Sequence, residues 1–376
     1  MKPKILFVVN VDWFFISHRL PIALQAIKQG YEVHLATQLT SFQNFLESQG
    51  IIVHSFSISR SKANPLSLLL LFSRFVYLFY SVGPQIIHLV TIKPVIIGGI
   101  AARVVKVPGV VIAISGLGST FLDHGFVGTI RKKFIFLLYK LALRHKNLKI
   151  IFQNQDDHFS INKIISLKDD QITFIKGSGV DLSKFNFDPL PFNNLVIMPS
   201  RLLKDKGVYE FIEAAKILKK LNSQIVCVLV GDIDHGNPSS VSEKEIESWV
   251  NSSLIEYWGH RSDMSNILSR ADLVVLPSYR EGFPKVLMEA AAKGRPVITT
   301  DVPGCRDAIE PNISGVLVPV KNSFILADTI FGLMGNHELL LEMGKNGRKL
   351  AENNFSESGV SQHHMSIYAE LINKNY

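Results

Sequence analysis

REGFPKVLMEAAAKGRPVITTD, residues 280–301, follows the apolar run DLVVLPS (272–278), which has the composition of a buried strand. Pro284 suits the first position of a helix, and Gly294 suits the position just after its end. PVITTD (296–301) then indicates a second buried strand. A strand, a helix and a strand in this order form the repeating unit of a parallel sheet that helices cover on both faces.

The same alternation of apolar runs and helical patterns extends through the chain, interrupted by the Pro- and Asn-rich stretch FNFDPLPFNN (185–194). Further strands are expected at 4–10, 31–37, 51–56, 85–91, 110–115 and 149–154, and after the interruption at 195–200, 225–232, 254–259 and 315–319. Helices are expected at 20–29, 41–49, 65–82, 94–105 and 128–146, then at 207–221, 242–251, 263–270 and 356–374. The expected fold is α/β, with two tandem doubly wound Rossmann-like domains that face a central cleft: 1–187, completed by helix 356–376, and 188–355.

Charge is distributed unevenly over the 376 residues. Residues 1–190 contain 21 Lys and Arg against 10 Asp and Glu, whereas residues 191–376 contain 19 against 22. The basic half indicates an anionic partner, such as nucleic acid, an acidic membrane surface or a phosphorylated lipid. A hydrophobic fraction of 47% excludes a disordered chain, and two cysteines exclude a disulfide scaffold.

Two cations follow the first strand expected in the second domain. In PSRLLKDKG (199–207), Arg201 and Lys206 lie in a loop that can direct both toward one point beside the start of a helix. Such a pair suits a diphosphate, although a basic loop can also simply be solvated. After the next strand, Gly231 permits a close approach of a ligand to the backbone. The D-x-D spelled by residues 232–234 lacks further ligands for a hard cation, so no metal site is expected.

Two glutamates lie eight residues apart in the opening stretch, Glu281 in a loop and Glu289 on the first turns of the helix. A carboxylate such as that of Glu289 can accept hydrogen bonds from both hydroxyls of a ribose. The N–H groups of Gly282, Phe283 and Lys285 would point, with the helix dipole, toward a bound anion. Two surface charges would give the same spacing, but the glycine, the proline and the strands on either side favour a ligand site.

Four pieces of the second domain resemble the family 4 retaining glycosyltransferases, which have the GT-B fold: SRLLKDKG, EGFPKVLMEA, GRPVITTDVPGCRDAI and GVLVP. The spacing from Glu281 to Glu289 matches the E-x7-E signature of that family. Three pieces of the first half resemble bacterial transferases that add N-acetylgalactosamine, or a related sugar, to an undecaprenyl-diphosphate-linked saccharide: FFISHRLPIALQAIKQGYEVHLAT, SGLGSTFLD and GSGVDLSKF. These relatives include enzymes of O-antigen synthesis, a part of lipopolysaccharide biosynthesis.

The resemblance implies a hexosyl transfer from a UDP-sugar that needs no metal and no cofactor. Arg201, Lys206 and Glu281 would be catalytic, the two cations by holding the donor diphosphate and stabilising the leaving UDP. The residues that would bind the donor are Gly231, Arg261, Gly282, Phe283, Pro284, Lys285 and Glu289, with Glu289 on the ribose and Arg261 near the base. The chain departs from the family where NVDW (10–13) replaces a Gly-Gly loop and where Ser115 and Gly116 replace a histidine.

Candidate acceptor-binding residues lie in the first domain. Ser17, His18 and Arg19 are expected to open the first helix, where His18 and Arg19 could hold an acceptor diphosphate or orient a hydroxyl group. A capping serine with two partly exposed neighbours explains the same residues. Lys93, which follows the strand expected at 85–91, is open to the same two interpretations.

A basic amphipathic stretch, RKKFIFLLYKLALRHKNLK (131–149), contains no acid. The residues expected to face an anionic inner-membrane surface are Arg131, Lys132, Lys133, Lys140 and Arg144. A packed helix with a solvated basic face fits the same pattern. With the hydrophobic segment 65–82, in which Arg74 argues against a membrane span, the stretch predicts a cytoplasmic protein bound peripherally to the inner face of the cell membrane.

Two other functions stay open on the sequence. The same fold could serve a UDP-sugar 2-epimerase or a phosphorolytic enzyme, which UDP release dependent on a lipid-linked acceptor would exclude. The basic half could instead bind a polyanion such as heparin. Nucleic acid is not expected as a partner, because the aromatic residues do not alternate with basic ones as a stacking platform requires.

Overall fold

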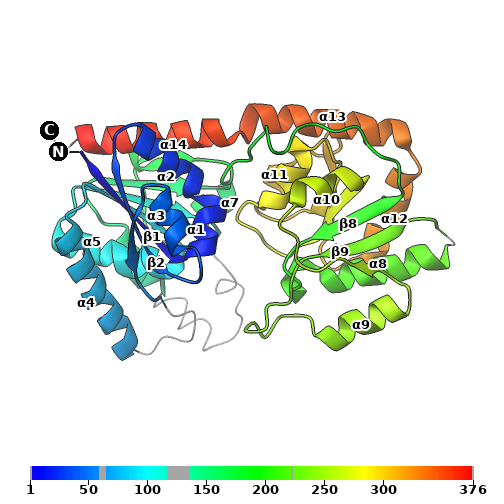
Figure 1. The fold of residues 1–376 in the computed structure, drawn as a ribbon, viewed down its shortest axis with the longest axis horizontal. Helices are drawn as coiled ribbons and strands as arrows, with labels where there is room; N and C mark the ends of the chain where they lie inside the picture. Colours follow the sequence, from blue (N-terminus) through cyan, green and yellow to red (C-terminus); the bar gives the residue numbers. More distant parts are fainter. Residues whose placement is uncertain (1, 59–64, 117–134, 222, 375–376) are drawn as a thin grey trace. The chain divides into compact units, whose positions relative to one another are not determined.

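The computed structural model describes all residues except 1, 59–64, 117–134, 222 and 375–376 (Figure 1). Its internal contacts divide the chain into two units. Unit 1 comprises Met1–Ser178 with Ser358–Tyr376, and unit 2 comprises Gly179–Glu357. Each unit is built on one parallel sheet, as the alternating sequence pattern predicts.

Unit 1 contains a seven-stranded sheet in the order β3-β2-β1-β4-β5-β6-β7. Its strands are β1 (Lys4–Val11), β2 (Glu32–Gln38), β3 (Ile52–Ser55), β4 (Ile86–Val90), β5 (Gly109–Ile114), β6 (Leu148–Phe152) and β7 (Ile172–Phe174). The residues from Ile5 to Val9 are completely buried, because helices cover both faces of the sheet. This is why the central strands are continuous apolar runs and do not alternate.

The helices of unit 1 form two layers. One layer consists of α4 (Pro65–Val82), the π-helical turn η1 (Pro94–Gly98), α5 (Gly99–Val105), the helical residues 135–142 and α7 (Gln155–Asn162), followed by the turn η3 (Asp169–Gln171). The other layer consists of α1 (Asp12–His18), α2 (Leu20–Lys28), α3 (Gln43–Ser48) and the C-terminal helix α14 (Glu357–Asn373). α14 is part of this core, because the hydroxyl of buried Tyr368 and Nδ1 of buried His88 share a hydrogen bond of 2.6 Å.

Unit 2 contains a six-stranded sheet in the order β10-β9-β8-β11-β12-β13. Its strands are β8 (Leu195–Pro199), β9 (Val226–Val230), β10 (Glu256–Tyr257), β11 (Leu273–Leu276), β12 (Val297–Thr300) and β13 (Gly315–Val318). Its helices are η4 (Lys204–Lys206), α8 (Val208–Lys220), α9 (Glu243–Asn251), α10 (Met264–Arg270), α11 (Lys285–Ala292), η5 (Arg306–Ala308), α12 (Ser323–Met334) and α13 (His337–Asn354).

Within the described residues, no single helix has both the length and the apolar composition needed to cross a membrane. The pair α12 and α13, bent by 99°, meets that test only when the two helices are taken together. Both helices contribute buried side chains to the core of unit 2, among them Leu326 and Leu340.

The start of the first helix differs from the sequence expectation. β1 leads directly into α1 at Asp12, so Ser17 and His18 lie in the last turn of a helix and do not open one. The Asp12 carboxylate explains the early start, because it accepts a hydrogen bond from the N–H of Trp13 (2.8 Å) in the first turn of α1. Arg19 lies between α1 and α2, at the N-cap position of α2.

Two further elements end earlier in the chain than expected. The strand expected at 254–259 comprises only Glu256–Tyr257, because it lies at the edge of the sheet and pairs with β9 alone. Of the helix expected at 128–146, residues 128–134 lie outside the described residues, and the described part ends at residue 142 before the chain turns toward β6. Of the residues predicted to face a membrane, Arg131, Lys132 and Lys133 lie outside the described residues, whereas Lys140 and Arg144 are exposed.

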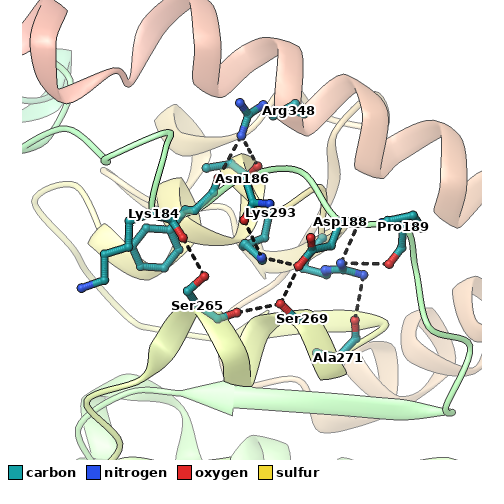
Figure 2. A network of polar contacts seen from close by, with 12 residues as sticks. Lys184, Asn186, Asp188, Pro189, Ser265, Ser269, Ala271, Lys293 and Arg348 are labelled. Carbon is teal, nitrogen blue, oxygen red and sulfur yellow. Dashed lines mark hydrogen bonds and ion pairs between the residues drawn. The ribbon is translucent and has the colours of Figure 1, made fainter.

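The stretch 185–194, which the sequence suggests is a linker, is anchored within unit 2 (Figure 2). The buried ammonium group of Lys293 forms an ion pair with Asp188, and the buried guanidinium of Arg295 donates to the carbonyl of Asp188 (2.8 Å). Arg348 donates to the carbonyl of Phe185 (2.9 Å). Buried cations are costly unless they are paired, so these contacts make the stretch part of the unit 2 structure.

Candidate functional site

The carboxyl ends of β8 and β11 mark the place where the strand order of unit 2 reverses. β9 and β10 lie on one side of β8, whereas β11, β12 and β13 lie on the other. Ligands of doubly wound sheets bind at such a switch point, because the loops that follow the two strands diverge there. The loop after β8 carries Arg201 and Lys206, and the loop after β11 carries Glu281. The structure therefore brings the predicted catalytic residues to the two loops of the switch point.

Lys206 and Glu281 form an ion pair at this switch point. Lys206 Nζ lies 2.5 Å from Glu281 Oε1, and the two side chains are only 13% and 14% exposed. The hydroxyl of Ser278 donates a hydrogen bond to the same carboxylate oxygen (2.8 Å). An ammonium group has three N–H donors, so two remain for a ligand as far as the described residues are concerned. Glu281 thus holds Lys206 in one place without using all of its donors.

Gly207 allows the loop after β8 to reach the end of β11. Its φ is +79°, in the left-handed region, and a Cβ atom there would lie 2.2 Å from the carbonyl oxygen of Pro277. Gly304 has a similar part in the loop after β12, with a φ of +80° and a Cβ position 2.4 Å from the carbonyl oxygen of Gly282. The site is therefore assembled from loops whose backbones touch, which only glycine permits at these two positions.

We expect Gly207→Ala to destabilise unit 2 by at least about 2 kcal/mol, because alanine is disfavoured in the left-handed region and would also meet Pro277. Urea unfolding followed by circular dichroism measures the change. Gly332→Ala is the matched control, because a Cβ atom at this position in α12 meets no atom within 4 Å. Equal stability of the two variants would contradict the close approach of the two loops.

Arg201 is held more loosely than Lys206. Its side chain is 55% exposed, and its Nη1 lies 3.4 Å from Oδ2 of Asp234. A long, exposed contact of this kind contributes little, so the guanidinium is available to a ligand. Asp234 belongs to the D-x-D at 232–234, but the described part of the chain contains no group of three or more His, Cys, Asp or Glu side chains placed to hold a metal ion.

Gly231 is explained by the protein's own backbone. Its φ is +149°, and a Cβ atom there would lie 1.8 Å from the carbonyl oxygen of Ser200. Its N–H donates to the carbonyl of Gly259 (2.9 Å), and its own carbonyl accepts from the hydroxyl of Tyr257 (3.1 Å). The close approach that requires glycine is made by the neighbouring strand end, and no ligand is needed to account for it.

Glu289 lies on α11 and is only 9% exposed. Burial raises the pKa of its carboxyl to about 7, and the charges of Lys285 and Lys184 oppose this shift. Lys285 Nζ is 3.9 Å from Glu289 Oε1, which is too long for a hydrogen bond. No described residue donates a hydrogen bond to this carboxyl, so its oxygens can accept from the hydroxyls of a ligand.

The other predicted donor residues are placed differently. Pro284 is the N-cap of α11, and the helix begins one residue later, at Lys285. The Phe283 ring packs against Phe355 with centroids 5.4 Å apart, so only its backbone can face a ligand. Arg261 forms a two-pronged ion pair with Asp263, both contacts 2.9 Å, and this pair raises the pKa of Arg261. Arg261 follows β10, two strands from β8, and no described contact joins it to the Lys206–Glu281 pair.

Unit 1 has its own switch point, between β1 and β4. A pocket of about 320 Å³ lies there, and the residues with polar side chains in its lining are Asn10, Thr91, Lys93, Ser115 and Tyr139. Thr91 has a φ of +73°, which costs on the order of 1–3 kcal/mol for a β-branched residue. Its hydroxyl and Oδ1 of Asn10 are buried without a hydrogen-bond partner. Strain and unpaired polar atoms at a switch point together indicate a binding site.

Arg19 lies behind this pocket and is only 3% exposed. It donates to the carbonyl of His18 (2.9 Å) and to the hydroxyl of Ser115 (3.4 Å). No carboxylate of the described chain pairs with it, and burial lowers the pKa of its guanidinium to about 10. The His18 ring stacks on Phe14, which lines the pocket. Of the predicted acceptor residues, Lys93 therefore lines the pocket directly. Arg19 contacts Ser115 and His18 contacts Phe14, and both of these partners line the pocket.

The sequence analysis missed Asn10, Thr91 and Ser278 as site residues. All three stand at the carboxyl end of a buried parallel strand, and a polar residue at such a position is the signal that could have identified them. The positive φ of Thr91 has no signal in the sequence, because threonine ordinarily favours extended backbone. The partner of Glu281 also comes from a distant loop, which sequence spacing does not reveal.

Two family models match the chain. The model described as "Glycosyl transferase 4-like" matches residues 4–154, and the model described as "Glycosyl transferases group 1" matches residues 184–350. The first match falls in unit 1 and the second in unit 2. The two matched ranges contain the switch-point residues described above.

Curated relatives match over most of the chain. The Campylobacter jejuni N,N'-diacetylbacillosaminyl-diphospho-undecaprenol alpha-1,3-N-acetylgalactosaminyltransferase is 30% identical over 95% of this chain and 98% of its own. The Escherichia coli UDP-Gal:alpha-D-GlcNAc-diphosphoundecaprenol alpha-1,3-galactosyltransferase is 29% identical over 72% of each chain. Both similarities span parts of both units.

Solved structures share the architecture at lower identity. Anabaena HepE, solved in complex with UDP, matches with a TM-score of 0.79 at 20% identity, over 98% of this chain and 100% of its own. Sucrose-phosphate synthase from Thermosynechococcus elongatus matches with a TM-score of 0.80 at 19% identity, over 99% and 100%. The relatives and the two doubly wound units show that the chain belongs to the group 1 glycosyltransferases, enzymes with the GT-B fold.

Proposed function

We propose that the chain is a retaining glycosyltransferase that moves N-acetylgalactosamine, or another N-acetylhexosamine, from a UDP-sugar to an undecaprenyl-diphosphate-linked saccharide during bacterial surface-polysaccharide or glycan assembly. The observation that best supports a UDP-sugar as the donor is the Lys206–Glu281 ion pair at the switch point of unit 2. The acceptor half is supported by the two curated relatives, because both of their names contain a diphospho-undecaprenol-linked sugar. HepE, which shares the fold, was solved with UDP.

The transfer breaks the bond between sugar C1 and the terminal phosphate oxygen of UDP, and it forms a bond between C1 and the acceptor hydroxyl oxygen. The electron pair of the broken bond leaves with UDP, and the hydroxyl proton passes to the departing phosphate or to solvent. Negative charge therefore grows on the diphosphate. The Lys206 ammonium, the Arg201 guanidinium and the N–H groups at the start of α11 are suited to stabilise this charge. We propose that these groups act without a metal ion or a cofactor.

The carboxylates have supporting parts in this scheme. Glu281 accepts hydrogen bonds from Lys206 and Ser278, so it is a positioning residue for the ammonium group. Glu289 offers a buried carboxylate to the two hydroxyls of the donor ribose. Neither carboxylate needs to form a covalent bond to the sugar, because the leaving group is stabilised by the cations.

The pocket at the switch point of unit 1 suits the acceptor. The ammonium group of Lys93 can contact an acceptor phosphate, and the unpaired polar atoms of Asn10 and Thr91 can contact sugar hydroxyls. Arg19, which no described carboxylate neutralises, adds positive potential behind Ser115. A lipid-linked acceptor also requires the enzyme to work at a membrane surface, so we propose peripheral binding at the cytoplasmic face of the cell membrane.

A panel of UDP-sugars, tested against short-chain polyprenyl-diphosphate saccharides, examines this proposal. We expect UDP release that depends on the lipid-linked acceptor, an alpha-linked product by NMR, the fastest turnover with an N-acetylhexosamine donor, and full activity in EDTA. UDP release without an acceptor, together with a 2-epimer, would support the epimerase alternative. Release that depends on phosphate would support the phosphorolytic one. The absence of product with every pair of donor and acceptor would refute the proposal.

A further inference from the structure

Positive charge is concentrated on one part of a helical layer of unit 1. From residue 65 to residue 146 the described residues include no acid, and six cations among them are exposed: Arg74, Arg103, Lys106, Lys140, Arg144 and Lys146. These cations lie on, or just after, α4, α5 and the helical residues 135–142, which pack on one face of the sheet. The opposite layer carries acids of its own, such as Glu370 on α14. α7 and η3, in the same layer as α4, carry Asp156, Asp157, Asp169 and Asp170, so the positive surface is confined to α4, α5 and residues 135–146.

α4 also presents an apolar stripe to solvent. The members of the α4 stripe are Leu66, Leu69, Leu70, Tyr77 and Tyr80, which are between 57% and 82% exposed. Their spacing of three, four and seven residues places them on one side of the helix, opposite Phe75 and Phe79, which pack in the core. Continuous exposed apolar surface marks an interaction site, and tyrosine is favoured at the boundary between membrane and water.

The same layer contains a hollow of about 610 Å³, where α5 ends and the chain approaches β6. We call this the cationic hollow, because its lining includes Arg103, Lys106, Arg144 and Lys146 and no acid. Ile100, Val104 and Pro108 supply an apolar part of its wall. The cationic hollow lies beside the amino ends of β5 and β6. The pocket at the switch point of unit 1 lies at the carboxyl ends of the strands, so the two are separate sites.

Helix ends explain only part of this charge. A cation at a helix C-terminus interacts favourably with the last carbonyl groups, and Arg103 does this by donating to the carbonyl of Leu141 (2.7 Å). Within the described residues, the side chains of Lys106, Arg144 and Lys146 form no hydrogen bond and no ion pair. Like charges around one hollow repel each other unless an anion binds among them.

We propose that the cationic hollow binds the phosphate of an anionic phospholipid headgroup, and that the α4 stripe rests in the same bilayer surface. The cations suit a phosphate, whereas the apolar wall and the stripe suit the glycerol and acyl parts of a lipid. Nucleic acid or free phosphate would leave these apolar side chains in water. This proposal rests on the proposed function in one respect, that the enzyme works at a membrane surface. The vesicle-binding test uses no substrate.

Co-sedimentation with vesicles tests the cationic hollow. We expect the wild-type protein to bind vesicles that contain phosphatidylglycerol more tightly than vesicles of phosphatidylcholine alone. Lys106→Glu/Lys146→Glu should bind the anionic vesicles at least about thirtyfold more weakly, because each lost cation costs about fivefold in affinity. Tyr77→Ser/Tyr80→Ser should also weaken binding. The matched control is Lys28→Glu/Lys345→Glu, which changes the net charge equally at exposed positions on α2 and α13 and should bind like the wild type.

Control measurements separate lipid binding from the transfer reaction and from the binding of inorganic phosphate or duplex DNA. All variants should keep wild-type circular dichroism and wild-type turnover with a water-soluble acceptor, which separates this proposal from the transfer reaction. The proposal is overturned if the hollow variant binds anionic vesicles like the wild type, or if the control variant loses as much affinity. It is also overturned if inorganic phosphate or duplex DNA binds the hollow in preference to the vesicles.

Discussion

Replacement of Lys206 by alanine is expected to lower kcat by about 10²- to 10³-fold, the usual cost of removing one group that stabilises developing charge in an active site. The ammonium group lies at the switch point of unit 2, held by Glu281 and only 13% exposed. Its loss removes a positive charge from the place where the diphosphate becomes more negative during transfer. Steady-state UDP release with a saturating lipid-linked acceptor measures the change.

Three further variants define the cause of that loss. Arg201→Ala should also lower kcat, because its exposed guanidinium is free to move onto the diphosphate. Lys206→Arg should recover little of the lost kcat, because a planar guanidinium does not fit the place in which Glu281 holds the compact ammonium group. Lys216→Ala, which removes an exposed cation from α8, should have no effect. Wild-type turnover by folded Lys206→Ala would show that the leaving group is stabilised by other residues.

Replacement of Glu289 by glutamine is expected to weaken donor binding by about 10- to 100-fold, because a charged acceptor of two hydroxyl groups is lost. The same variant should be more stable than the wild type at pH 8, by up to about 3 kcal/mol. Burial raises the pKa of this carboxyl from 4.5 to about 7, so the folded protein binds the extra proton. The stabilising contribution is therefore complete below pH 4.5 and is lost as the pH rises through 7. Glutamine cannot ionise and avoids that loss.

Urea unfolding at a series of pH values, with donor KM measured in parallel, tests the effect of Glu289. The stability gain of Glu289→Gln should shrink as the pH falls toward 5, and wild-type donor affinity should fall over the same range as the carboxyl becomes protonated. Glu342→Gln, at an exposed position on α13, should change neither quantity. A glutamine variant that is less stable than the wild type at pH 8 would contradict the assignment of a buried carboxylate to which no described residue donates a hydrogen bond.

The sequence predicts most of the fold because buried parallel strands are continuous apolar runs. Ile5 to Val9 and the run at 272–278 show this plainly, and the helix beginning near Pro284 follows from local rules for helix ends. The short strand β7 (Ile172–Phe174) was missed, because three residues carry too little pattern. α1 was missed because the large apolar residues after Asp12 resemble the end of a strand more than the start of a helix.

The candidate site is predicted in outline and not in detail. Strand order places Arg201, Lys206 and Glu281 at neighbouring strand ends, which the positions of these residues after apolar runs already suggest. The contact of Lys206 with Glu281 depends on how two distant loops pass each other, and that is set by the backbone at Gly207. Gly231 was predicted to bind a ligand from its place at a strand end, and the structure adds a reason for glycine that the sequence does not reveal, the close approach of the Ser200 carbonyl.

A crystal structure with UDP bound tests the central claim most directly. The account predicts that the diphosphate lies within hydrogen-bond distance of the Lys206 ammonium, with the Arg201 guanidinium turned toward it from Asp234, and that both ribose hydroxyls donate to Glu289. A well-ordered nucleotide that binds elsewhere on unit 2 and leaves the Lys206–Glu281 pair without a ligand would contradict it.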